Sequence, residues 1–381
     1  MVFYKVRCIC LVLICCFQLG CGGSGGGNEA ITYSASTSSL NLGSSLSSVA
    51  ASSSPATGLT LTQKIDSYLE ANQSADQPGI SILVVKNGRI AYSGSKGMAD
   101  IITGTSISAQ TGFLLASVSK PFTAIAVMQL VESGQLKVTD SVLDYIPELP
   151  PSWRRITIEH LLTHRSGIYD IINDGWRPSL LNGMTNNDLL TYLIKNPALE
   201  FEPGTTGDYS NTGYALLATV VERVTGLRFP NYMALNVFGP ANMNSYITYE
   251  NQEIKNGDAL NYARLRTYYG ITNYLIGSSG QVSSAEDFLN FFEALRTEKI
   301  IMANTLATMS RPHGRLYGGV MGYGFGISGD ALTHAGQWDG FETEISINFR
   351  TGIDSVILTN SGSAGRSKIS AIMHIIYSTS F

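Results

Sequence analysis

The segment from Phe113 to Met128 most strongly constrains the fold, because it is apolar nearly all round and carries a single charge, at Lys120. A helix without a polar face has to be buried on every side, so this chain needs a core that surrounds it. The 381 residues, 44% of them hydrophobic, are enough for one large domain or two medium ones. Pro121 indicates that the helix begins just before it, since proline is tolerated in the first helical turn.

Two reactive side chains lie at the start of this predicted helix. Ser117 and Lys120 are three residues apart, which places them on one helical face. An amine beside a hydroxyl in an apolar setting can activate that hydroxyl as a nucleophile. The same spacing recurs at Ser93 and Lys96, but that copy has no apolar helix behind it. The buried helix therefore favours the first copy.

The two ends of the folded part predict strands of one sheet. Residues 79–86 and 89–95 predict two strands joined by Asn87-Gly88, a strong hairpin signal. Residues 341–350 alternate between apolar and polar side chains, which is typical of a half-buried strand, and residues 354–360 predict its neighbour. The expected terminal helices are residues 61–71 and 368–377.

The middle of the chain is mostly helical in pattern. The expected helices are residues 117–132, 158–164, 186–195, 214–224 and 285–295. We predict an α/β fold of the α+β type, in which both termini build an antiparallel sheet flanked by helices and a mainly helical subdomain is inserted. The sheet part would cover about residues 61–116 and 296–381, and the helical part about 117–295. A site is expected between the two parts.

The N-terminus predicts export. Lys5 and Arg7 precede an apolar run too short to span a bilayer, so residues 1–20 are expected to be a signal peptide. Leu19-Gly20-Cys21 resembles a bacterial lipobox, and Cys21 is the expected lipidation site; the alternative is ordinary cleavage without lipid. Residues 21–60 are Gly- and Ser-rich, which predicts a flexible tether. We expect a periplasmic or cell-surface domain anchored to a bacterial membrane.

Composition excludes several classes of site. All five cysteines lie within the first 21 residues, so the folded part has no disulfide framework, cysteine nucleophile or thiolate zinc site. The net charge is −4, and no basic cluster follows the N-terminus. A nucleic acid is therefore not an expected partner.

Two further segments carry polar side chains with catalytic potential. The Gly-rich segment 201–214 precedes a predicted helix and presents Tyr209 and Asn211, a phenol that can relay a proton and an amide that can hold a substrate. His334 and Gly336 begin the alternating strands, where a glycine can mark the close approach of a ligand. Each segment alone is also compatible with a helix cap, a loop aromatic or an ordinary strand histidine.

Together, Ser-x-x-Lys, Tyr-x-Asn and His-x-Gly occur in an order that resembles the penicillin-recognising serine hydrolases. The resemblance is to the branch that contains class C β-lactamases, DD-carboxypeptidases and the related family VIII esterases. Residues 156–167 and 280–287 also resemble segments of that family, and the likeness extends from Leu61 to the C-terminus. It implies a β-lactamase/transpeptidase-like fold.

The resemblance implies an acyl-enzyme mechanism without metal or organic cofactor, on a small-molecule or peptide substrate. Ser117 would be the nucleophile and Lys120 the base, while Tyr209 would relay a proton to the leaving group or activate water. Asn211 would orient the substrate carbonyl, and the backbone N–H groups of Ser117 and Gln337 would form the oxyanion hole. Whether Lys120 or Tyr209 is the base in each half-reaction stays open.

Three positions depart from the family pattern. His334 stands where many relatives carry lysine, which predicts a rate that follows a histidine titration near neutral pH. Ala335 and Gln337 lack the hydroxyl that relatives acting on free peptide carboxylates often have. These departures favour an esterase or broader amidase over a DD-carboxypeptidase.

Two alternatives remain at the level of sequence. A sensor or binding protein for penicillin or cell-wall fragments would keep Ser117 and acylate without efficient turnover. His160 and His164 are four residues apart on a predicted helix and could both bind a metal ion, but no third ligand suggests itself.

Overall fold

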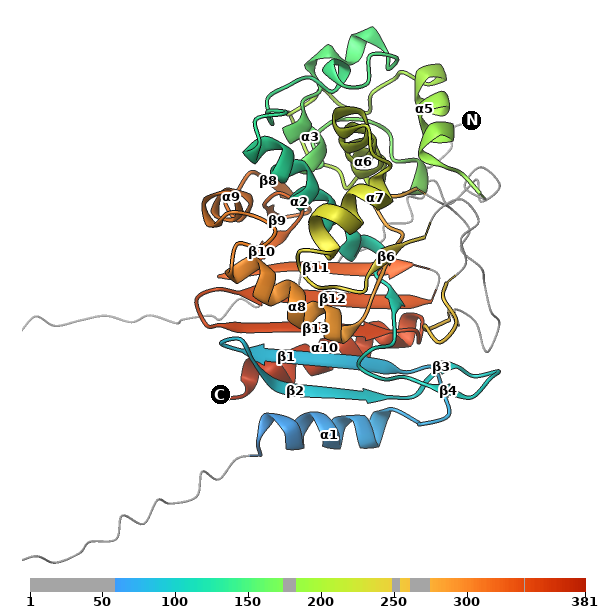
Figure 1. The fold of residues 1–381 in the computed structure, drawn as a ribbon, viewed down its shortest axis with the longest axis vertical. Helices are drawn as coiled ribbons and strands as arrows, with labels where there is room; N and C mark the ends of the chain where they lie inside the picture. Colours follow the sequence, from blue (N-terminus) through green and yellow to red (C-terminus); the bar gives the residue numbers. More distant parts are fainter. Residues whose placement is uncertain (1–58, 174–182, 249–253, 261–274, 339) are drawn as a thin grey trace, which may run out of the picture. The chain divides into compact units, whose positions relative to one another are not determined.

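The computed structural model describes residues 59–173, 183–248, 254–260, 275–338 and 340–381 (Figure 1). The expected signal peptide, Cys21 and all but the end of the expected tether lie outside the described residues. No helix within the described ranges is long and apolar enough to cross a membrane.

An antiparallel sheet of eight strands is formed by both ends of the described chain (Figure 1). Its order is β2-β1-β13-β12-β11-β10-β9-β8, and β1 from the N-terminal end pairs with β13 from the C-terminal end, Ile80 facing Thr359. The predicted sheet completed by both termini is therefore observed. The strands are β1 (Ile80–Lys86), β2 (Arg89–Lys96), β8 (Gly314–Leu316), β9 (Gly319–Met321), β10 (Gly326–Ser328), β11 (Ala331–Trp338), β12 (Phe341–Asn348) and β13 (Ile353–Thr359).

The two faces of this sheet pack into two separate cores, because successive side chains of a strand point to opposite faces. Along β1, Ile82 and Val84 join the core under α1 (Leu61–Asn72) and α10 (Ser363–Ser378), whereas Leu83 and Val85 join the main core. On that second face, α8 (Ala285–Arg296) packs against β1 and β13 (Figure 1). The helix α8 thus lies on the large sheet, whereas the sequence predicts that residues 117–295, which include α8, belong to the helical part.

The expectation that residues 341–350 form a half-buried strand is wrong. Glu342, Ser346 and Asn348 on the expected solvent face of β12 are all buried, and Phe349 is exposed. The cause is α10, which packs on the polar face of the strand. A carboxylate can be buried there because Arg366 of α10 pairs with it.

The apolar segment that begins at Phe113 starts with the short strand β5 (Phe113–Leu114), continues through the 3-10 turn η1 (Ala116–Val118) and then forms α2 (Ser119–Glu132). Eleven of its fourteen residues are buried, as the absence of a polar face predicted. The other helical elements are η2 (Val142–Asp144), η3 (Pro151–Arg155), α3 (Ile158–Leu162), η4 (Ile171–Asn173), α5 (Asn186–Lys195), α6 (Asn211–Thr225), α7 (Phe229–Met233), η5 (Ala234–Phe238) and α9 (Ala303–Met309).

Two small sheets complete the described structure. β3 (Met98–Asp100) pairs with β4 (Thr105–Ser106). β7 (Gln281–Ser283) lies between β5 (Phe113–Leu114) and β6 (Tyr246–Ile247), and this second sheet leads directly into η1. The start of α2 is therefore held by this three-stranded sheet, and η1 also packs against β11 and β12 of the large sheet.

Candidate active site

Ser117 is placed by a tight turn between β5 and α2. Ala116 adopts a left-handed backbone conformation with φ 51°, which is unfavourable for a residue with a Cβ and has to be imposed by its surroundings. Leu115, just before it, is held on both sides. Its N–H donates to the Gln281 carbonyl at 2.8 Å, and its carbonyl accepts from the Thr343 hydroxyl at 2.7 Å. Both sheets thus fix the turn that carries Ser117.

Lys120 lies one turn after Ser117 and is completely buried. Its Nζ contacts the Asn211 Oδ1 at 2.7 Å and the Ser278 carbonyl at 2.9 Å, and it lies 3.1 Å from the Ser117 Oγ. The first two partners can only accept hydrogen bonds, so they take two N–H groups of the amine. In a neutral amine the lone pair then points to the Ser117 hydroxyl, which is the arrangement that a general base needs.

Burial also gives Lys120 the protonation state that a base requires. Loss of solvation lowers the pKa of Lys120 to about 7, and the negative charge of Asp170 opposes this by raising it. A substantial fraction of the amine is therefore neutral near pH 7. An exposed lysine would be protonated almost entirely at that pH.

Tyr209 lies against both of these groups. Its ring centroid is 4.8 Å from the Lys120 Nζ, and its side chain is hydrogen-bonded to Ser117. Burial raises the pKa of Tyr209, and the charge of Asp170 raises it further, while the hydrogen bond with Ser117 lowers it. The phenol therefore keeps its proton near neutral pH. That makes Tyr209 a proton donor in this site and leaves Lys120 as the proton acceptor.

Asn211 is the first residue of α6, and not a loop residue before the helix as expected. The helix cap is Ser210, whose hydroxyl accepts from the Gly213 N–H at 2.9 Å. Because Asn211 is not the cap, its amide is free to contact Lys120. The structure brings Ser117, Lys120, Tyr209 and Asn211 into one cluster, although 91 positions separate Lys120 from Asn211.

The strand β11 passes close to Ser117 on its other side. A Cβ added at Gly336 would lie 3.1 Å from the Ser117 N and 2.3 Å from the Leu115 carbonyl. Glycine is therefore required where β11 meets the nucleophile turn. Gln337 follows, and its exposed side chain is hydrogen-bonded to Glu342 of β12. The two expected oxyanion donors, at Ser117 and Gln337, thus lie on segments in direct contact.

Replacing Gly336 with alanine should lower kcat by about 10²–10³-fold, the effect of losing an oxyanion donor. The added Cβ would meet the Leu115 carbonyl at 2.3 Å and the Thr343 hydroxyl at 2.4 Å, so β11 would have to move away from Ser117. Steady-state kinetics and the melting temperature would be measured together. Gly326→Ala is the matched control on β10, since its Cβ would meet nothing closer than 3.4 Å. Unchanged turnover in Gly336→Ala would contradict this account of β11.

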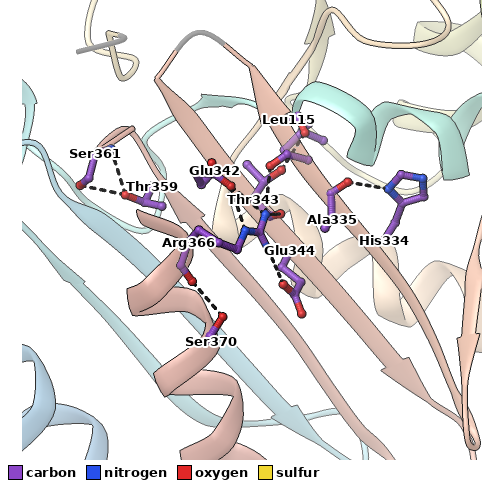
Figure 2. A network of polar contacts seen from close by, with 11 residues as sticks. Leu115, His334, Ala335, Glu342, Thr343, Glu344, Thr359, Ser361, Arg366 and Ser370 are labelled. Carbon is purple, nitrogen blue, oxygen red and sulfur yellow. Dashed lines mark hydrogen bonds and ion pairs between the residues drawn. The ribbon is translucent and has the colours of Figure 1, made fainter. Parts of the chain in front are cut away.

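His334 is buried, and its Nδ1 lies 2.8 Å from the Ala335 carbonyl (Figure 2). Burial and the nearby charge of Lys120 lower the pKa of His334 to about 3. The histidine is therefore uncharged throughout the neutral range. This contradicts the expected histidine titration near neutral pH, because the pKa of His334 lies well below that range. The group of the site whose pKa does lie near 7 is Lys120.

We expect kcat/KM to rise with pH through about 7, because Lys120 as an ammonium cannot accept the proton of Ser117. His334→Gln should leave this midpoint in place, since the histidine carries no charge to lose. Profiles between roughly pH 5 and 9 for both proteins would test this. A midpoint that disappears in His334→Gln would assign the titration to the histidine instead.

An ion-pair network holds β11 and β12 on the face of the sheet that α10 covers (Figure 2). Arg366 of α10 contacts Glu342 at 2.8 Å and Glu344 at 2.7 Å, and one of its Nη2 contacts is the Gly336 carbonyl at 3.4 Å. Burial raises the pKa of Glu342, and the charge of Arg366 lowers it. This network holds β11 and β12 in place, and β11 is the strand that approaches Ser117.

Two residues of the cluster were missed as candidates from the sequence. His164 was considered only as a metal ligand, but α3 ends at Leu162, and His164 turns away with φ 58°. Its ring stacks on Tyr209 with the centroids 4.5 Å apart, and its Nδ1 accepts from the Ser210 N–H at 3.0 Å. Because burial lowers its pKa well below the ordinary value, His164 is neutral. It therefore serves as a support for Tyr209.

The second missed residue is Asp170, a buried carboxylate that accepts from the Asn211 Nδ2 at 2.9 Å. A single aspartate in an apolar segment gives no sequence signal for this contact. The second Ser-x-x-Lys copy lies elsewhere, with Ser93 exposed on β2 and Lys96 paired to Glu70 at 2.6 Å. Within the described ranges, no three His, Cys, Asp or Glu side chains gather into a group that could hold a metal ion.

Comparisons with known proteins concern the family and the fold of this chain. A family model described as Beta-lactamase matches residues 61–376. The chain is 31% identical to penicillin-binding protein 4* of Bacillus subtilis (strain 168) over 293 residues, which are 69% of this chain and 64% of that protein. It thus spans less than two thirds of that relative's length.

Solved structures with the same fold include two proteins of different description. A penicillin-binding protein from Bacillus halodurans has a TM-score of 0.72 at 26% identity, over 82% of this chain and 98% of that one. The D-amino acid amidase from Ochrobactrum anthropi SV3 has a TM-score of 0.69 at 18% identity, over 82% and 99% of the two chains. At that identity the second likeness concerns the fold alone. The predicted fold class is confirmed.

Proposed function

Because the chain belongs to the beta-lactamase family, we propose that it is a serine hydrolase that works through an acyl-enzyme at Ser117. The observation that carries this proposal is the environment of Lys120. Two pure acceptors hold its N–H groups, and the remaining position faces the Ser117 Oγ at 3.1 Å. A lysine buried only for structural reasons does not need its lone pair directed at a hydroxyl.

In the acylation step, the Ser117 Oγ attacks the substrate carbonyl carbon while its proton passes to the neutral Lys120. The carbonyl electron pair moves to oxygen, where the backbone N–H groups of Ser117 and Gln337 stabilise the developing charge. Collapse of this intermediate breaks the bond to the leaving group. Tyr209 gives that group a proton and regains one from the Lys120 ammonium.

In the second step, water takes the place of the leaving group. It attacks the acyl carbon and gives its proton to Lys120, and when the ester bond to the Ser117 Oγ breaks, the Lys120 ammonium returns a proton to that oxygen. The products are the acid and the free hydroxyl of Ser117. The raised pKa of Tyr209 and the lowered pKa of Lys120 support Lys120 as the first proton acceptor.

The substrate we propose is an amide or ester without a free carboxylate next to the scissile bond. His334 is uncharged near neutral pH, and Ala335 and Gln337 offer no hydroxyl on β11. A substrate carboxylate would find no fixed cation from these three side chains. Small esters and neutral amides therefore fit this site better than a peptide ending in D-Ala-D-Ala, and better than penicillins or cephalosporins, which also carry a carboxylate next to the scissile amide.

A panel of substrates tests this proposal. It compares a short-chain ester, a chromogenic cephalosporin and a peptide that ends in D-Ala-D-Ala, with the acyl-enzyme followed by intact mass. Turnover of the ester above that of the peptide is expected. If all three acylate Ser117 and none is released, the sensor that acylates without turnover is the better description.

For the N-terminus we propose export and a lipid anchor at Cys21, based on the basic start, the short apolar run and Leu19-Gly20-Cys21. A lipid on Cys21 would hold the domain at a bacterial membrane, in the periplasm or at the cell surface. Labelling cells with a fatty-acid analogue tests this, with Cys21→Ser as the unlabelled control. Equal labelling of the two proteins would exclude Cys21 as the attachment site.

A further inference from the structure

We propose that Asp170 is a positioning residue for catalysis, whose carboxylate fixes the direction of the Asn211 amide and serves as the counter-charge of Lys120. The proposal rests on the serine hydrolase function above. Among the described residues, the Asp170 carboxylate accepts hydrogen bonds from Asn211, Thr212 and Ile172, and none of these comes from Ser117. Its effect on the reaction passes through Asn211 and Lys120.

Asp170 is held at the start of α6 as an acceptor of hydrogen bonds. Its carboxylate accepts from the Asn211 Nδ2 at 2.9 Å, from the Thr212 N–H at 3.3 Å and from the Thr212 hydroxyl at 3.3 Å. The Asn211 backbone N–H also contributes. The Thr212 hydroxyl in turn accepts from the Ile171 N–H at 3.2 Å, so it is a donor toward Asp170. A negative charge is favourable there, because the N-terminus of a helix carries a partial positive charge.

The contact with Asn211 decides which end of its amide faces Lys120. Because Asp170 can only accept, the Nδ2 of Asn211 turns to it, and the Oδ1 turns to the Lys120 Nζ at 2.7 Å. With the amide reversed, an N–H would face the amine and engage its lone pair. Lys120 could then no longer direct that lone pair to Ser117. The orientation of one amide thus separates a base from an amine that only donates hydrogen bonds.

Asp170 also supplies the negative charge that raises the pKa of Lys120 against the effect of burial. The other groups that face Lys120 are the neutral rings of His164 and His334, the phenols of Tyr209 and Tyr214, and the Ser117 hydroxyl. Asp170 itself faces Lys120 and raises the pKa values of Tyr209 and Tyr317. Burial raises the pKa of Asp170, whereas the hydrogen bonds from Asn211 and Thr212 and the charge of Lys120 lower it. The hydrogen-bond donors on both oxygens favour the charged form of the carboxylate over the neutral one.

The test is the pH profile of kcat/KM for Asp170→Asn, measured on the full chain with the short-chain ester. Loss of the negative charge lowers the pKa of Lys120, so the acidic limb should move about one pH unit lower. The maximal rate should fall about 10- to 100-fold, because the Asn211 amide loses its fixed direction. A change in stability alone would not move the limb.

Asp287→Asn is the matched control. Asp287 is also a buried carboxylate at the start of a helix, α8, but it accepts hydrogen bonds from Asn244, Ser245, Ser283 and Ser284, outside the Ser117 cluster. Both variants should lower the melting temperature, and only Asp170→Asn should move the acidic limb. Equal movement of the limb in both variants, or in neither, overturns the proposal.

If Asp170→Asn does not fold, Asp170→Glu tests the positioning role instead. It keeps the charge and displaces the carboxylate, so a lower maximal rate with the limb in its original place is expected. An unchanged rate in Asp170→Glu overturns the positioning role. Intact mass of the wild-type protein with an activated-serine probe that carries no carboxylate separates this result from the function itself. An adduct on Ser117 together with an unmoved limb refutes Asp170 alone, whereas the absence of any adduct refutes the serine hydrolase.

Discussion

Ser117→Ala should lower kcat by about 10⁶-fold, the loss expected when the nucleophile of a covalent mechanism is removed. The acyl-enzyme cannot form without the Oγ, and the remaining contacts can only bind the substrate. Because Ser117 is half-buried in a turn held at Leu115 and Ala116, removal of one oxygen should leave the fold intact. Intact mass after treatment with a penicillin or an activated-serine probe measures the adduct, and steady-state kinetics measure the turnover.

Ser93→Ala is the control for this experiment, because Ser93 occupies the same place in the second Ser-x-x-Lys copy. It is exposed on β2, away from Tyr209 and Asn211. We expect full labelling and full turnover in Ser93→Ala. An adduct that persists in Ser117→Ala would refute the assignment of the nucleophile.

Lys120→Met should lower the acylation rate constant by about 10²–10⁴-fold, the usual contribution of a proton-transfer group. Methionine fills nearly the same volume but cannot accept the proton of Ser117. It also leaves the Asn211 Oδ1 and the Ser278 carbonyl without the amine, which costs about 1–3 kcal/mol for each unpaired buried group. Single-turnover kinetics and the melting temperature would separate the loss of rate from the loss of stability.

Lys96→Met provides the comparison for Lys120. Its ammonium is paired to Glu70, whose side chain is largely exposed, and such surface pairs contribute little to stability. Neither the rate nor its pH dependence should change in Lys96→Met. If Lys120→Met acylates at the wild-type rate, Lys120 is structural and another group is the base.

The order of helices and strands along the chain followed from local patterns. Asn87-Gly88 fixed a hairpin, and a helix without a polar face had to become the buried α2. The pattern at residues 341–350 misled, because alternation reports which side chains are polar and not what covers them. Glu342 can be buried because it pairs with Arg366, 24 positions later in the chain. A local sequence pattern does not show such a pairing.

The residues of the candidate site also fall into two groups, those that a local motif identifies and those that only the packing reveals. Short motifs identified Ser117, Lys120, Tyr209, Asn211 and His334, because each motif has a fixed local spacing. The supports of the site have no such spacing. His164 stacks on Tyr209, and Asp170 orients Asn211 from 41 positions earlier in the chain. Only the packing of the loop after α3 against the start of α6 reveals both residues.

The sequence alone determined that this chain has a buried helix with Ser117 and Lys120 at its start, and which groups could be their partners. Residue types and spacing are enough for that, since they define the available donors, acceptors and nucleophiles. Only the tertiary structure decided their protonation states. Burial lowers the pKa of Lys120 to about 7 and that of His334 to about 3, and it raises that of Tyr209. A protonation state depends on solvation and on charges that distant segments bring together, and these exist only in the folded chain.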